Sequence, residues 1–217
     1  KAPFLHLGFR PFFMSAIIGG IILVGLWMGL YLMGWQILPA NYPSVTWHAH
    51  EMIYGYGAAV VVGFLLTAVK NWTGVQTIHH TPLFVLFSLW VIVRLLVFIP
   101  EPWAFTSLAI LDSLFFLLAL IAYSHPVVKV RQWNQLVFSG KLLFLFAGNV
   151  LFYLGMLGVF EGGLLEKATH YGLYIGLYTI VAIIFTMGRR VIPFFIEKGL
   201  DVPFQPKNHR WVDISSL

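Results

Sequence analysis

Residues 47–69 read WHAHEMIYGYGAAVVVGFLLTAV, in which three ionisable side chains stand directly before an apolar run. His48, His50 and Glu51 occupy the first turns, and residues 58–69 carry no charge. About 20 predominantly apolar residues are enough to cross a bilayer as an α-helix. Ionisable groups at the mouth of such a helix are costly without a partner. The stretch therefore predicts a membrane-spanning helix whose first turns bind a metal, cap the helix or hold a proton.

The composition of the whole chain is that of a helical membrane protein. Of its 217 residues, 59% are hydrophobic and 10% are charged, whereas soluble domains carry about 25% charged residues. We therefore expect an all-α fold, a polytopic bundle of transmembrane helices. The chain has no Cys, which excludes thiolate metal sites and disulfides within it. A net charge of +5, scattered along the sequence, does not indicate nucleic-acid binding.

Six apolar stretches predict six spans, each bounded by Pro or by charged and aromatic residues. The predicted spans are residues 11–38, 47–69, 82–99, 103–123, 136–160 and 168–192. Residues 1–217 are thus expected to form one transmembrane domain. Since the chain begins at Lys1 and ends soon after residues 211–214, which resemble the approach to another span, we expect it to be the amino-terminal half of a longer protein.

Basic residues flank the predicted spans mainly on one side of the membrane, whereas the loops on the other side carry no excess of Lys or Arg. The basic residues on that side are Arg10, Lys70, Lys129, Arg131, Arg189, Arg190, Lys198, Lys207 and Arg210. The positive-inside rule then predicts that the amino terminus and the carboxy-terminal basic tail are cytoplasmic.

His50 and His170 are the leading candidates for a haem or metal site. The predicted topology puts both near the outward ends of their spans, and His170 shares a helical stripe with Tyr174 and Tyr178. Imidazole binds iron and copper, and two His residues on facing helices can hold a haem. We therefore expect His50, His170 and Tyr174 to contact a haem.

His48 and Glu51 extend the set of candidate metal ligands to His48, His50, Glu51 and His170. His48 is two positions from His50, so the two imidazoles should point in different directions. The alternative interpretation is that His48 and Glu51 are interfacial side chains, with Glu51 favoured by the helix dipole in the first turn.

Arg94 and Asp112 are charged residues inside the third and fourth predicted spans. Arg94 lies about six residues before the outer end of its span and Asp112 about nine after the outer start of the next, so their depths match within a few ångströms. Buried charges in a bilayer are usually paired or functional. We predict an Arg94–Asp112 ion pair; the rival interpretation is that Arg94 binds a haem propionate or another anion.

Four blocks of sequence resemble the NnrS family. They are HLGFRPFF at 6–13, WHAHEM at 47–52, GFLLTAVKNWTG at 63–74 and MGRRVIPFF at 187–195. The resemblance implies a multi-pass protein of the bacterial inner membrane with about twelve spans, associated with haem and copper and with the response to nitric oxide and nitrosative stress. It therefore implies haem b and copper as cofactors, but no catalytic residue.

Two functions remain open from the sequence. The first is a haem- or copper-binding membrane protein that handles nitric oxide or protects against it. The second is a transporter or a respiratory-complex accessory subunit without its own redox cofactor, in which His50, Glu51 and the Arg94–Asp112 pair serve proton coupling or packing. The predicted spans end at Pro and are not interrupted by it, which favours the first function. The expected partners are the lipid bilayer, nitric oxide and a respiratory subunit.

Overall fold

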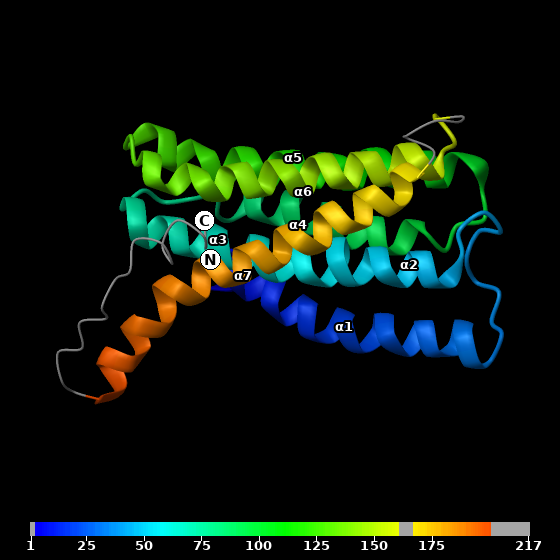
Figure 1. The fold of residues 1–217 in the computed structure, drawn as a ribbon, viewed down its shortest axis with the longest axis horizontal. Helices are drawn as coiled ribbons and strands as arrows, with labels where there is room; N and C mark the ends of the chain where they lie inside the picture. Colours follow the sequence, from blue (N-terminus) through cyan, green and yellow to red (C-terminus); the bar gives the residue numbers. More distant parts are fainter. Residues whose placement is uncertain (1–2, 161–166, 201–217) are drawn as a thin grey trace.

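The computed structural model describes residues 3–160 and 167–200, and within these ranges the chain is helical, with no strand (Figure 1). The α-helices are α1 (Phe9–Leu32), α2 (Ser44–His50), α3 (Ala58–Thr73), α4 (Thr81–Leu96), α5 (Pro102–Lys129), α6 (Leu136–Met156) and α7 (Ala168–Leu200). A π-helix, η2 (Glu51–Gly57), joins α2 to α3, and two short 3-10 helices are η1 (Pro3–Leu5) and η3 (Trp133–Gln135). The predicted all-α class is confirmed.

Five helices are long and apolar enough to cross a membrane. They are Phe9–Leu32, Ser44–Thr73, Trp103–Lys129, Trp133–Met156 and Ala168–Gly199. The second of them consists of α2, η2 and α3 in one continuous rod. The chain is therefore a multi-pass helical membrane protein, as its composition predicted.

The third predicted span, residues 82–99, forms α4, but this helix is shorter than predicted. It has 16 residues, about 24 Å at 1.5 Å per residue, against a hydrocarbon core of about 30 Å. Phe98 and Ile99 are held in turns outside the helix, with backbone N–H groups bonded to Leu95 and Leu96. Pro100 follows directly, and the residue before a proline disfavours helical geometry. The helix therefore stops before the predicted boundary.

The fourth and sixth predicted spans are longer than predicted. They were expected to end at Tyr123 and Ile192, but α5 continues to Lys129 and α7 to Leu200, so that Pro126 and Pro193 lie inside helices. A proline removes one backbone hydrogen bond, and membrane helices tolerate this loss where neighbouring groups satisfy the freed carbonyl. The prediction that the spans end at Pro126 and Pro193 is therefore wrong, whereas the helices run through both prolines without a break.

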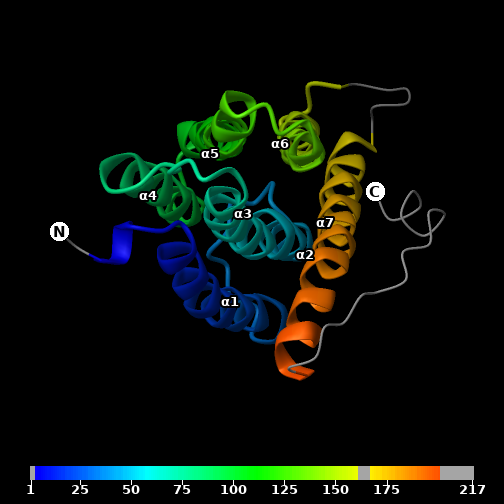
Figure 2. The same ribbon diagram turned by 90° about the vertical axis from the view of Figure 1, so that its left-hand side faces the viewer.

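The central position in the bundle belongs to α3. The view along the bundle shows α3 surrounded by α1, α4, α5 and α7, with α6 between α5 and α7 (Figure 2). The α2–η2–α3 rod is the most buried of the five long helices and α1 is the most exposed. Because His50 and Glu51 lie on this central rod, their side chains enter the interior of the bundle and not its surface.

At one end of the bundle α3 and α5 finish and α4 and α6 begin (Figure 1). Six basic residues in the helix ends and loops there and in α7 define the basic end: Arg10, Lys70, Lys129, Arg131, Arg189 and Arg190. Lys207 and Arg210, which belong to the predicted basic tail, lie outside the described residues.

Candidate functional site: a buried ionic cluster

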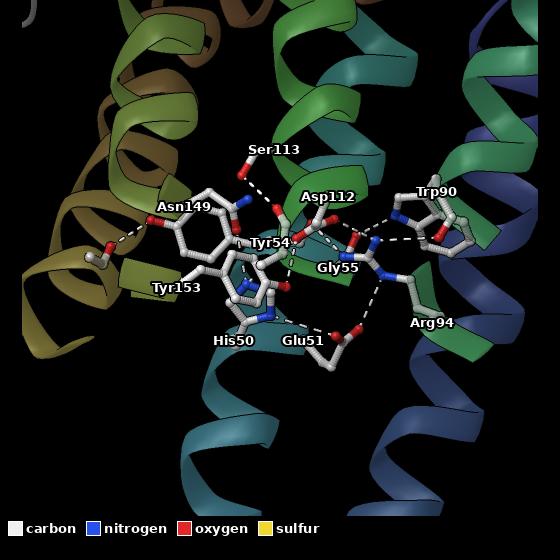
Figure 3. Close-up of polar contacts among 12 residues, drawn as sticks. His50, Glu51, Tyr54, Gly55, Trp90, Arg94, Asp112, Ser113, Asn149 and Tyr153 are labelled. Atoms are coloured by element: carbon white, nitrogen blue, oxygen red, sulfur yellow. Dashed lines mark hydrogen bonds and ion pairs between the residues drawn. The ribbon is translucent and has the colours of Figure 1, made fainter. Parts of the chain in front are cut away.

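Ionisable side chains from the central rod and two further helices meet inside the bundle (Figure 3). His50 is the last residue of α2, Glu51 the first of η2, Arg94 lies in α4 and Asp112 in α5. Their exposed fractions are 0%, 4%, 8% and 0% respectively. We call these four residues the ionic cluster.

Arg94 is the centre of the cluster. Its Nη1 donates to Asp112 Oδ1 at 2.9 Å and its Nε donates to Glu51 Oε2 at 3.2 Å. Nη1 and Nη2 also donate to the backbone carbonyls of Trp90 and Tyr54, so that four of the five guanidinium N–H groups are satisfied. The predicted Arg94–Asp112 ion pair is confirmed. Glu51 is a second counter-ion of Arg94, which the sequence did not reveal.

His50 lies between the two carboxylates. Its Nε2 forms a 2.9 Å hydrogen bond with Asn149 Oδ1. The same Nε2 is 3.6 Å from Asp112 Oδ2, and Nδ1 is 3.6 Å from Glu51 Oε1. On α6, Phe152 stacks on the imidazole with ring centroids 4.4 Å apart. The contact with Asn149 therefore joins α2 to α6.

The cluster packs two carboxylates around one guanidinium. Arg94 pairs with both Glu51 and Asp112, and the imidazole of His50 lies 3.6 Å from each carboxylate. Buried charges inside a bilayer are costly unless they are paired, so these contacts hold the four side chains together. Tyr153 contributes a further hydrogen bond, from its hydroxyl to Asp112 Oδ2 at 3.1 Å.

The π-helix η2 supplies backbone groups to the cluster. Tyr54 O accepts from Arg94, and Gly55 O accepts a 3.1 Å hydrogen bond from Trp90 Nε1. A Cβ on Gly55 would lie 2.6 Å from Glu51 Oε2 and 3.3 Å from Arg94 Nε. Single-turn π-helices are rare and frequently occur at functional sites. Glycine at this position is therefore what allows the Glu51–Arg94 pair to pack against η2.

Tyr42, in the loop before α2, lies at the edge of this region. It is 3% exposed and packs edge-on against Phe105 with centroids 5.4 Å apart. Burial, together with the nearby carboxylates of Glu51 and Asp112, raises the pKa of its phenol well above the usual value. Tyr42 is therefore neutral at physiological pH.

His48 points away from the cluster. Its ring stacks on Trp27 of α1 with centroids 4.2 Å apart, and its Nδ1 has no hydrogen-bond partner among the described residues. His50 faces Asn149 and Phe152 of α6 instead. The prediction that the two imidazoles diverge is confirmed.

His170 and Tyr174 lie on the exposed side of α7. Tyr174 is 55% exposed and stacks on Tyr178 at a centroid distance of 6.2 Å. His170 is also exposed, whereas His50 is fully buried. No recorded contact joins the two imidazoles in the described part of the chain. Their pairing about one haem therefore stays a prediction.

The predicted ligand residues differ in how well their surroundings would accommodate haem or copper. His50 is fully enclosed: its Nε2 faces Asn149, Phe152 covers one ring face, and its Nδ1, which has no hydrogen-bond partner among the described residues, lies 3.6 Å from Glu51 Oε1. With 0% of the side chain exposed, a haem does not fit beside it in this arrangement. His170, being exposed, is open to one. Copper requires several ligands around one point, and the described residues gather no group of three His, Cys, Asp or Glu that could hold a metal ion. Arg94 is already occupied by two carboxylates and does not offer a free site for a propionate.

One buried charge escaped the sequence reasoning. Lys141 in α6 is 8% exposed and its Nζ hydrogen-bonds to Thr186 Oγ1 and Ala182 O of α7. It is the only charged residue of that helix, and this isolated charge in an apolar segment is the signal that could have revealed it.

The comparisons with known proteins agree with the resemblance seen in the sequence. The family model described as NnrS protein matches residues 3–217. No curated protein and no solved structure matches the chain. Since the family match covers nearly the whole sequence, the chain belongs to the NnrS family.

Proposed function

We propose that this NnrS-family chain is a haem-binding protein of the bacterial inner membrane that handles nitric oxide or protects the cell from it. The observation that carries the proposal is the family match over residues 3–217, because the NnrS resemblance implies haem and a response to nitric oxide. Nitric oxide is small and apolar, so it partitions into the bilayer, where a membrane-embedded haem can bind it. The basic end of the bundle then faces the cytoplasm by the positive-inside rule.

His170 is the haem ligand in this proposal, with Tyr174 beside the macrocycle. Haem iron needs one or two protein ligands, so a single exposed imidazole is enough to bind it. The aromatic side chains of Tyr171, Tyr174 and Tyr178 are all exposed on the same helix. When bound, haem would supply an iron that takes up nitric oxide, and the residues of this chain would hold and orient it.

Copper has weaker support among the described residues. His48 is the candidate ligand, because its Nδ1 is buried without a hydrogen-bond partner in the described chain. It would need further ligands. The ionic cluster acts in this proposal as a positioning element that ties α2, α4, α5 and α6 together.

A second function, a proton-coupled transporter or an accessory subunit of a respiratory complex, is favoured by a different observation. The ionic cluster buries four ionisable side chains, and the π-helix η2 interrupts the regular helix of the central rod beside them. Irregular helices around buried charges are common in transporters. This function needs no redox cofactor.

The optical spectrum of the purified protein separates the two functions. The full protein is extracted from bacterial membranes, and its spectrum, iron content and copper content are measured before and after anaerobic addition of nitric oxide. A Soret band that shifts on addition of nitric oxide supports the proposal. A colourless protein free of iron would sink it and leave the second function. The same spectrum is recorded for His170→Ala, which should lose the Soret band. His125→Ala is the matched control, because His125 is also exposed but lies near the other end of the bundle. The spectrum of His125→Ala should equal that of the wild type.

A further inference from the structure

Lys141 is a buried cation inside a membrane-spanning helix. It lies five residues after the start of α6, about 8 Å along the helix from the basic end. Its Nζ donates to Ala182 O at 3.1 Å and contacts Thr186 Oγ1, and both acceptors are neutral. Ionisable residues at such positions are costly and usually serve a function.

No carboxylate balances this charge within the described residues. All recorded ion pairs belong to the ionic cluster on the other side of α6. A second cation, the guanidinium of Arg190, lies 5.0 Å from the centroid of the Phe138 ring, and Lys141 Nζ lies 5.7 Å from the same centroid. Arg190 donates its recorded hydrogen bond to a neutral amide oxygen, Gln135 Oε1. Two cations around one aromatic ring thus attract an anion that the described chain does not supply.

A groove between α6 and α7 leads away from Lys141. Its volume is about 590 Å³, and its walls include Phe144, Tyr174 and Tyr178 as well as Lys141. Along α7 the lining residues extend from Tyr171 to Ala182, which is about 16 Å of helix. Phe144, Tyr174 and Tyr178 are 62%, 55% and 66% exposed, so the groove opens on the outer surface of the bundle. The groove is open and mostly apolar, with the ammonium group of Lys141 at one end.

We propose that this groove binds an anionic phospholipid of the leaflet at the basic end, with the lipid phosphate at Lys141 and one acyl chain along α6 and α7. Charge complementarity carries the choice of ligand, because an unbalanced buried cation favours an anionic head group. Basic pockets between membrane helices on the positive side are known to bind such head groups. The length and aromatic lining of the groove fit an acyl chain. The inference does not rest on the proposed haem, but Tyr174 belongs to both sites, so haem and lipid would compete for this part of α7.

Lipid titration of the purified, delipidated protein tests this site. Phosphatidylglycerol and phosphatidylcholine are added separately to the full protein in detergent, and bound lipid is measured by native mass spectrometry. We expect the wild type to prefer phosphatidylglycerol. Lys141→Met should bind it about five-fold more weakly, which corresponds to about 1 kcal/mol per basic residue, and should lose the preference between the two lipids.

Three further variants keep the test decisive. Lys141→Arg retains the charge and should retain the preference for phosphatidylglycerol. Phe144→Ser changes an exposed wall of the groove without disturbing the core, and should weaken both lipids equally. Lys129→Gln removes a positive charge at the same end but outside the groove, and should change neither.

Three results would overturn the inference. The first is equal binding of both lipids by the wild type. The second is equal behaviour of Lys141→Met and Lys129→Gln. The third is a groove occupied by haem, seen as a Soret band that Lys141→Met abolishes while lipid binding stays unchanged. A haem without lipid selectivity would leave the proposed function standing and remove this inference.

Discussion

Arg94 Nη1 donates a 2.9 Å hydrogen bond to Asp112 Oδ1 and thereby ties α4 to α5 inside the bundle. Glu51 Oε2 accepts from Nε of the same guanidinium at 3.2 Å, so that one cation joins the central rod to two other helices. The short α4 is thus anchored through its charge as well as through its apolar face.

Removing Arg94 should destabilise the protein strongly. Arg94→Met leaves Glu51 and Asp112 as two buried carboxylates without their cation, and breaking a buried pair costs about 3–5 kcal/mol. Asp112→Asn should cost less, because the Arg94–Glu51 pair remains and an amide oxygen still accepts from Nη1. Unfolding in detergent by sodium dodecyl sulfate titration measures both.

The double variant Arg94→Met/Asp112→Asn completes the cycle. Direct pairing predicts that the double variant is less destabilised than the sum of the two single variants. Simple additivity would contradict direct pairing. A charge swap is a poorer test here, since it would place a new carboxylate at position 94 beside Glu51.

Gly55→Ala should disrupt the cluster without changing any charge. The added methyl group would lie 2.6 Å from Glu51 Oε2, and overpacking in a tight interior typically costs about 1–3 kcal/mol. The loss should appear as a lower midpoint of thermal unfolding. Gly25→Ala is the control, because a Cβ at Gly25 of α1 meets nothing within 4 Å, so stability should stay equal or rise slightly. Equal effects of both substitutions would show that Gly55 has no special role.

Tyr54→Phe should loosen the contact between η2 and α7. The Tyr54 hydroxyl donates to Gly172 O at 2.5 Å, where both groups are buried. Removing the hydroxyl leaves a buried carbonyl without this donor, which costs about 1–3 kcal/mol. Tyr56→Phe, on the same π-helix but 41% exposed, is the matched control and should be near neutral. The prediction fails if the two variants unfold together with the wild type.

The helix lengths predicted from the sequence place Arg94 and Asp112 at matching depths, so their ion pair could be predicted. The ion pair of Arg94 with Glu51 could not be predicted from the sequence. It depends on the rotation of the central rod about its axis, which a π-helix between α2 and α3 changes in a way that periodicity does not reveal.

The directions of His50 and His170 likewise could not be predicted from the sequence. Equal depth suggested that His50 and His170 face each other, but the direction of a side chain depends on how α7 is rotated against α6. Close glycine contacts set that rotation: a Cβ at Gly172 would lie 2.6 Å from Gly148 O, so this face of α7 packs inward. His170 and Tyr174 consequently face outward. The helical Pro126 and Pro193 likewise depend on neighbouring helices and not on local sequence.

Paired optical spectra of His170→Ala and His50→Gln, purified under the same conditions as the wild type, test the central claim most directly. The account predicts a Soret band in the wild type and in His50→Gln, and its loss in His170→Ala, because in the proposed function the exposed imidazole on α7 would hold the iron, whereas the buried one belongs to the ionic cluster. A wild type without a Soret band, or a band unchanged in His170→Ala, would contradict the account.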